Sequence, residues 1–168
     1  MKTNKKGETL IEVIAALTSL VLAGIAAMTL IISVMTSTAI SKEYLIAQNL
    51  AREGIEGVTN IRDTNWLLYP SEKATKWLTV DTGGFYKLEK GDKKEFILTK
   101  GPLPITDDTY KIESVQSPPT FYRQITFSTV PPDLDLKERV KIAVTVAWMN
   151  KSNLTKYELS SILVNYEK

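Results

Sequence analysis

Lys5-Lys6-Gly7-Glu8-Thr9-Leu10-Ile11-Glu12 leads directly into a run without charged residues, from position 13 to position 41. At about 1.5 Å per residue, an α-helix over residues 13–35 is roughly 35 Å long and can cross the hydrocarbon core of a bilayer. Glu12 places a carboxylate at the start of this apolar helix. A charge in that position costs free energy, so we expect the carboxylate to have a partner.

The apolar run is interpreted as a retained membrane helix. A secretory signal peptide has a shorter apolar region followed by a cleavage site of small residues, whereas this tract is long and residues 35–39 fit such a site poorly. Three positive charges precede the run, on Lys2, Lys5 and Lys6. The two charges that follow it, on Lys42 and Glu43, are of opposite sign and cancel each other. The positive-inside rule therefore predicts a single-pass protein with a cytoplasmic N-terminus and an extracytoplasmic C-terminal domain.

Composition limits the remaining functions. A chain of 168 residues has room for one anchor and one compact domain. The net charge is +2 with basic and acidic residues interspersed, which gives no support for nucleic-acid binding. The chain has no cysteine and no histidine, so it lacks disulfides, the usual general base and the commonest metal ligand. With no nucleophile–base pair or phosphate loop in the sequence, we expect no enzyme activity and no cofactor.

Residues 42–63 are predicted to continue the same helix as an amphipathic half. An apolar stripe recurs at spacings of three and four: Ala47, Leu50, Ala51, Gly54, Val58 and Ile61. The opposite face is polar, and Arg52 and Glu56 form an i,i+4 pair on it. Gly54 and Gly57 each weaken the helix by roughly 1 kcal/mol relative to alanine, so packing must hold it. We expect the helix to end near residues 63–65.

Residues 64–168 are predicted to form an antiparallel β domain. A hairpin over 85–90 and 95–100 turns at Gly91-Asp92, and further strands are expected at 121–130, 140–148 and 157–166, with shorter ones at 77–80 and 110–115. Such a sheet needs a cover for its apolar face, and the amphipathic half of the helix supplies one. Trp66, Trp77, Tyr86 and Trp148 are expected in the core. The predicted fold class is α+β.

The residues from Gly7 to Val13 resemble the class III leader junction of type IV pilins and pseudopilins. That resemblance is specific over residues 2 to about 40 and architectural over the remainder. It implies that residues 1–7 are a leader, that prepilin peptidase cuts between Gly7 and Glu8, and that the new terminus is usually N-methylated. Residues 8–41 would then be the transmembrane and polymerisation helix, in a pilin-like fold.

Residues 47–56 also resemble the helix of minor pilins and type II secretion pseudopilins. The implied function is therefore a structural subunit, of the minor kind, in a type IV pilus or pseudopilus at the cell surface. The implied partners are prepilin peptidase, other pilin or pseudopilin subunits and the assembly platform in the membrane. The family usually has phenylalanine or another apolar residue after the cut, whereas this chain has Glu8.

Glu12 has a physical role in such an assembly. Lipid solvates leucine as well as a neighbouring helix does, so bare apolar helices have little to set their axial stagger. A carboxylate costs about 2.5–3.5 kcal/mol in the membrane and seeks a cation. Leader removal creates an ammonium group on Glu8, which a neighbour's Glu12 can pair with at one axial offset. Uncleaved chains lack that amine.

Other interpretations stay open. Thr9 and Glu12 fit a capping box with Thr9 as the N-cap, a role compatible with pairing. The rival function is a monomeric single-pass membrane protein whose extracellular β domain binds a ligand. Two acidic pairs, Asp107-Asp108 and Asp133/Asp135, offer oxygen ligands for calcium but also suit solvated turns. Asn150 and Asn153 begin glycosylation acceptor triplets.

Overall fold

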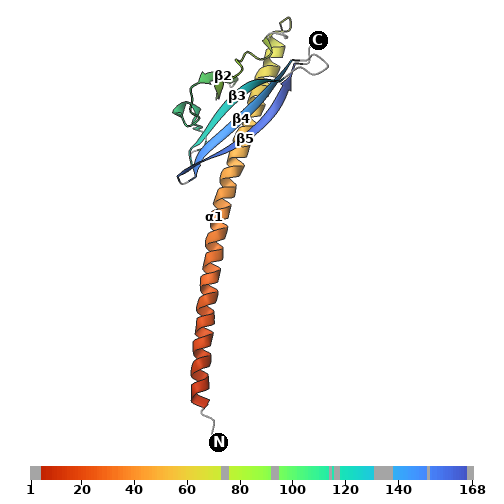
Figure 1. Ribbon diagram of the computed structural model, residues 1–168. Coiled ribbons are helices and arrows are strands. Elements are labelled where there is room, and N and C mark those ends of the chain that lie inside the picture. The colour runs from red at the N-terminus through yellow and green to blue at the C-terminus, as the bar shows by residue number, and fades with distance from the viewer. Residues whose placement is uncertain are drawn as a thin grey trace. The chain divides into compact units, whose positions relative to one another are not determined.

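The computed structural model describes residues 5–72, 76–91, 95–113, 115, 118–130, 138–150 and 152–165, with only the backbone described for 5–8. The chain consists of two compact units, Met1–Lys42 and Glu43–Lys168, which we describe separately. Helix α1 (Lys5–Leu68) contributes residues to both units, and the five strands belong to the second (Figure 1). The α+β class predicted from the sequence is confirmed.

Both ends of α1 differ from the prediction. The helix begins at Lys5, so Thr9 lies within it and is not an N-cap. An N-cap residue has non-helical backbone angles, which Thr9 does not have. At the other end the helix continues to Leu68, beyond the expected stop at 63–65. Tyr69 precedes Pro70, and a residue before proline is driven out of the α region, so the helix stops there.

The sheet contains β1 (Phe85–Lys90), β2 (Phe96–Gly101), β3 (Phe121–Val130), β4 (Arg139–Asn150) and β5 (Asn153–Val164), in the order β2-β1-β3-β4-β5. All neighbouring strands are antiparallel, as predicted. The predicted hairpin is confirmed, with Lys90 paired to Phe96. The predicted strands at 121–130 and 140–148 are also confirmed. The last strand begins earlier than expected because Asn150 pairs directly with Asn153.

Two shorter predicted strands are wrong. Residues 78–80 have no regular structure. Around position 110 the chain forms a 3-10 helix, η1 (Asp108–Tyr110), followed by a single bridge between Lys111 and Tyr122. Asp107 caps η1 by accepting a hydrogen bond from the Thr109 N–H, and the buried Tyr110 donates from its hydroxyl to the Pro102 carbonyl at 2.6 Å. These local bonds hold a turn where apolar alternation had indicated a strand.

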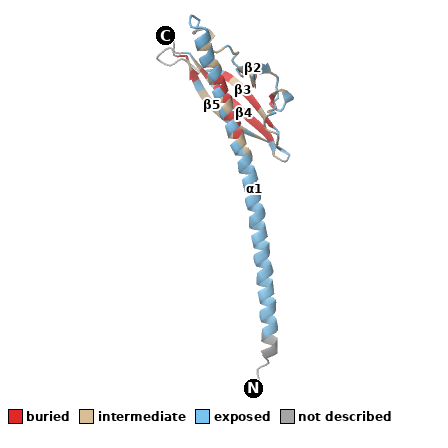
Figure 2. Ribbon diagram, turned by 180° about the vertical axis from the view of Figure 1, so that it is seen from behind, coloured by how far each residue is buried: buried red, intermediate tan, exposed pale blue. Residues whose placement is uncertain are grey.

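The core of the second unit lies between residues 43–68 of α1 and one face of the sheet (Figures 1 and 2). The helix contributes the stripe predicted from its spacing, with Ala47, Leu50, Ala51 and Val58 buried and Ile61 partly buried. The sheet contributes alternate residues of its central strands: Phe121, Ile125, Phe127, Val140, Ile142, Val144, Val146 and Trp148. Trp77 and Tyr86 are buried as expected, and Trp66 is partly buried against the same core.

Gly54 and Gly57 lie where the helix packs directly against side chains of the sheet. A Cβ atom on Gly54 would lie 2.8 Å from Cγ1 of Val144, and one on Gly57 would overlap the Leu88 side chain. Both contacts are too close for any residue with a side chain unless a neighbour moves. The two glycines, which weaken the isolated helix, are therefore what lets it pack on the sheet.

Polar contacts also join the helix to the sheet. The buried Arg123 of β3 donates from Nη1 to the Leu50 carbonyl at 3.2 Å and to Glu53 Oε2 at 3.0 Å. The indole Nε1 of Trp148 on β4 donates to Glu43 Oε2 at 2.9 Å. Glu53 of the helix thus pairs across to β3, while no ion pair joins the described side chains of Arg52 and Glu56, for which a pair was predicted.

Candidate functional site

The predicted processing and assembly residues all lie near the start of α1. Gly7 and Glu8 are in its helical backbone, and nothing beyond the backbone is described at these two positions. Glu12 lies one turn further along, with an exposed side chain. Within the described part of the chain, its carboxylate has neither an ion pair nor a hydrogen bond. The structure therefore supplies no intramolecular partner from the described side chains for this carboxylate.

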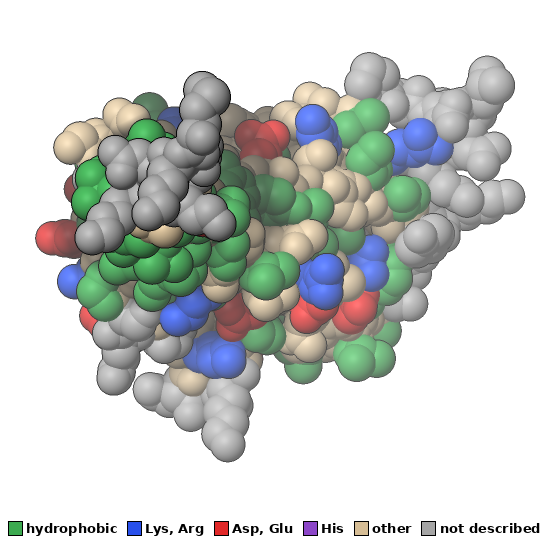
Figure 3. All heavy atoms as spheres, turned by 90° about the horizontal axis from the view of Figure 1, so that it is seen from below, with side chains coloured by type: hydrophobic (Ala, Val, Ile, Leu, Met, Phe, Trp, Pro, Cys, Tyr) green, Lys and Arg blue, Asp and Glu red, His purple; other side chains and the backbone are tan. Residues whose placement is uncertain are grey.

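Every residue from position 9 to position 42 is exposed. Large apolar side chains are exposed throughout this segment, for example Leu20 at 70%, Met28 at 66% and Met35 at 68%. Figure 3 shows a dense patch of hydrophobic side chains on the face of the molecule that is seen from below. We call residues 9–42 the apolar segment. It is part of the one candidate membrane-spanning helix among the described residues, Thr9–Leu68, and none of the most apolar window of that helix is buried within the chain.

Five hydroxyl groups of the apolar segment donate hydrogen bonds inside the helix. Thr18 donates to the Ile14 carbonyl at 2.7 Å, and Ser19 donates to the Ala15 carbonyl at 2.8 Å. Thr29, Thr36 and Thr38 bond in the same way to the carbonyl four residues earlier. Such bonds remove the cost of placing a hydroxyl in hydrocarbon, where water cannot solvate it. Most of the side-chain chemistry of the segment thus suits a lipid or helix-lined environment, and its charged exceptions are Glu12 near the start and Lys42 at the end.

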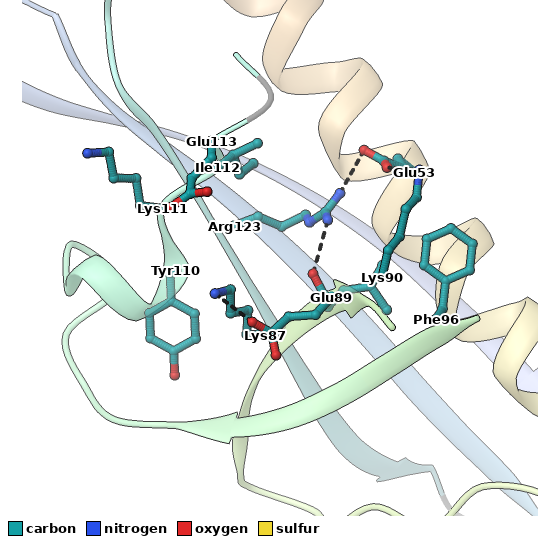
Figure 4. A pocket seen from close by; sticks show the side chains of 11 residues that line it. Glu53, Lys87, Glu89, Lys90, Phe96, Tyr110, Lys111, Ile112, Glu113 and Arg123 are labelled. Carbon is teal, nitrogen blue, oxygen red and sulfur yellow. Dashed lines mark hydrogen bonds and ion pairs between the residues drawn. The ribbon is translucent and has the colours of Figure 1, made fainter. Parts of the chain in front are cut away.

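The second unit contains a cavity of about 340 Å³ beside Arg123 (Figure 4). It arises because β1 pairs with β3 only at Phe85 and Tyr86, although it pairs with β2 along its whole length. Beyond Tyr86, the segment around Ile112 lies against β3 instead, with the Ile112 N–H bonded to the Phe121 carbonyl at 2.9 Å. The cavity opens between the two diverging segments. This is where the rival hypothesis would place a ligand.

The charged groups around the cavity are largely paired with one another. Arg123 is held by Glu53, and its Nη2 also lies 3.5 Å from the Leu88 carbonyl (Figure 4). Lys87 lies 2.8 Å from Glu89, which also accepts a hydrogen bond from the Thr99 hydroxyl at 3.0 Å. The Lys87 ammonium, followed by that hydroxyl, lowers the pKa of Glu89. These mutual pairs favour a structural role for the cavity's charges.

The calcium hypothesis gains no support at Asp107. Its carboxylate accepts hydrogen bonds from the N–H and hydroxyl of Thr109, first of all the hydroxyl, and these bonds lower its pKa. Among the described residues no group of three acidic side chains could hold a metal ion. Asp133 and Asp135 lie outside the described residues.

Of the two asparagines that begin glycosylation acceptor triplets, Asn153 is exposed and Asn150 is partly exposed.

The contacts that Glu43 and Arg123 make in the second unit were not identified from the sequence. Glu43 precedes Ala47 by four positions, so it extends the apolar stripe, and this spacing signals that its carboxylate faces the sheet. Arg123 shares the strand parity of Phe121 and Ile125, which signals an inward-facing charge.

In comparisons with protein-family models, curated proteins and solved structures, the chain gives no match. Functional assignment therefore depends on the residues themselves.

Proposed function

We propose that this chain is a structural subunit, of the minor kind, of a type IV pilus or pseudopilus. In this proposal prepilin peptidase removes residues 1–7, and the subunit then assembles through its N-terminal helix. The observation that carries the proposal is the apolar segment, exposed along its whole length, together with Glu12, just after the Gly7-Glu8 junction, whose carboxylate has no partner among the described side chains. A membrane anchor alone needs the apolar surface but not the carboxylate.

The physical basis is that an exposed carboxylate and a new amine can satisfy each other between subunits. Before processing, the chain carries Lys5 and Lys6 ahead of the junction and has no terminal amine at Glu8. After processing, the amine of one subunit and Glu12 of its neighbour form a pair that offsets the burial cost of both groups. Because the pair forms at one axial offset, it also fixes the stagger of otherwise featureless apolar helices.

The arrangement of the second unit supports the same proposal. Residues 43–68 of α1 bury one face of the antiparallel sheet, which gives a compact domain attached directly to the apolar segment. The domain would lie outside the cytoplasmic membrane, with the N-terminus inside, as the lysines of the leader indicate. Its partners would be prepilin peptidase, other pilin-like subunits and the membrane assembly platform.

Intact-mass measurement on membranes from cells that express the chain with a prepilin peptidase tests the processing step. We expect a product that begins at Glu8, and the same spectra report whether a methyl group is present. Gly7→Val should abolish that product. Gly24→Val is the matched control, because no atom lies within 4 Å of a Cβ at Gly24. A wild-type chain that keeps residues 1–7 would overturn the proposal and favour the monomeric ligand-binding alternative.

A further inference from the structure

A groove lies between the last turns of α1 and the start of β2, within the second unit. Its volume of about 630 Å³ is inside the range of about 300–1,000 Å³ that is typical of small-molecule sites. The helical residues of the groove recur at spacings of four, so they share one face of α1. The lining residues are Asn60, Ile61, Thr64, Asn65 and Leu68 of the helix and, around the start of β2, Glu95 and Phe96.

Three polar side chains of this groove are available to a ligand. Asn60, Thr64 and Glu95 are exposed, and their side chains make no hydrogen bond or ion pair within the described part of the chain. The amide of Asn60 and the hydroxyl of Thr64 each donate and accept, while the Glu95 carboxylate accepts. The groove therefore differs from the cavity beside Arg123, whose charges are largely paired with one another.

Apolar side chains form the rest of the groove. Ile61 and Phe96 are partly buried against the core, so packing fixes their positions. Leu68 is 64% exposed at the end of the helix. Together they offer a surface on which the C–H groups of a ligand can be removed from water, beside polar groups that can orient the same ligand.

The charge of the groove limits the kind of ligand. The described lining residues include one carboxylate, on Glu95, and no cationic side chain. Glu95 would repel an anionic ligand, and no lining cation would compensate. Lys90 lies outside the groove, with its ammonium 5.6 Å from the centroid of the Phe96 ring, so this ring already attracts a cation. These features favour a neutral ligand that carries both hydroxyl groups and C–H surface.

We propose that this groove binds a neutral oligosaccharide. A pyranose ring carries hydroxyl groups, each able to donate and accept a hydrogen bond, next to patches of C–H groups. The hydroxyl groups match the mixed donors and acceptors of Asn60, Thr64 and Glu95. The C–H patches match the packed side chains of Ile61 and Phe96. The inference is independent of filament assembly, because every lining residue belongs to the second unit.

Saturation-transfer NMR on the full chain tests this binding. The chain is held in perdeuterated dodecylphosphocholine micelles, because detergents with sugar headgroups would compete for the groove. The probes are three neutral trisaccharides, maltotriose, cellotriose and triacetylchitotriose. N-acetyltriglycine amide and spermidine serve as a neutral peptide and a cationic probe for comparison. We expect saturable transfer to at least one trisaccharide, and much weaker transfer to the two comparison probes.

Asn60→Ala and Thr64→Val should each weaken trisaccharide binding about three- to tenfold, because each removes one hydrogen-bonding side chain from the groove. Asn49→Ala is the matched control and should bind as the wild type does, since Asn49 is an exposed asparagine of the same helix that does not line the groove. Tryptophan fluorescence checks that all three variants are folded.

Three results would each overturn the inference. The first is no transfer to any of the three trisaccharides. The second is trisaccharide binding that Asn60→Ala and Thr64→Val leave unchanged, which would place the sugar elsewhere on the chain. The third is binding of the peptide or of spermidine that is as tight as that of the trisaccharides and is lost in the same two variants, which would assign the groove to a different class of ligand.

Discussion

Gly54 of α1 packs directly against Val144 of β4, at a distance that leaves no room for a Cβ atom. The helix and the sheet owe their close approach to this contact and to the similar one between Gly57 and Leu88. A residue that weakens the helix in isolation therefore strengthens the domain. This opposition between local propensity and packing can be measured.

Gly54→Ala is expected to destabilise the second unit by about 1–3 kcal/mol, because overpacking outweighs the gain in helix propensity of roughly 1 kcal/mol. Denaturant unfolding of the full chain in detergent, followed by tryptophan fluorescence, measures the change. Val144→Ala in the same chain should recover part of the loss. Gly24→Ala is the control, since its Cβ meets no atom within 4 Å. Equal stability of Gly54→Ala and wild type would show that the helix is not held this closely.

Glu43→Ala is expected to cost about 1–3 kcal/mol, because it leaves the indole N–H of Trp148 without an acceptor in a region from which water is largely excluded. Trp148 is fully buried, so its N–H has no ready replacement. Glu43→Gln keeps an acceptor oxygen and should cost less. The same unfolding measurement compares the two variants. If Glu43→Gln were as damaging as Glu43→Ala, the negative charge rather than the hydrogen bond would be responsible.

Lys87→Met is expected to raise the pKa of Glu89 toward its ordinary value of about 4.3, since the Lys87 ammonium is the main cause of its depression. NMR titration of the Glu89 carboxyl group measures this directly. Because the folded-state pKa is lowered, the pair adds stability above the unfolded-state pKa and loses it as pH falls through the folded-state pKa. Wild type and variant should therefore converge in stability once the pH falls below the lowered folded-state pKa of Glu89. An unchanged Glu89 pKa in Lys87→Met would contradict the pairing.

Much of the fold followed from periodicity. The alternation in β3 and β4 and the spacing of Ala47, Leu50 and Ala51 predicted elements that the structure confirms. Such elements can be predicted because each has one buried face, so that its apolar residues repeat with the period of a strand or a helix. The 3-10 helix at Asp108 was missed because the Asp107 cap and the buried Tyr110 compete with strand pairing, and alternation alone does not show which wins.

The contacts between distant segments were not predictable in the same way. The bond from Trp148 to Glu43 joins residues 105 positions apart, and the cavity beside Arg123 exists only because β1 leaves β3 after Tyr86. The first depends on how the helix meets the sheet, and the second depends on how the strands of the sheet pair. Gly7, Glu8 and Glu12 are the reverse case, because the proposal assigns them roles toward other proteins. The structure of a single chain gives the positions of these residues but does not include the proteins that they would contact.

The central claim is that the processed chain enters a filament through its N-terminal helix. The most direct measurement is its amount, by quantitative mass spectrometry, in sheared-filament and membrane fractions from cells that assemble pili. We predict that wild-type chain beginning at Glu8 is present in the filaments, and that Glu12→Ala is cut normally but is depleted from them. Filaments that contain no wild-type chain would contradict the claim, and normal incorporation of Glu12→Ala would contradict the pairing that it invokes.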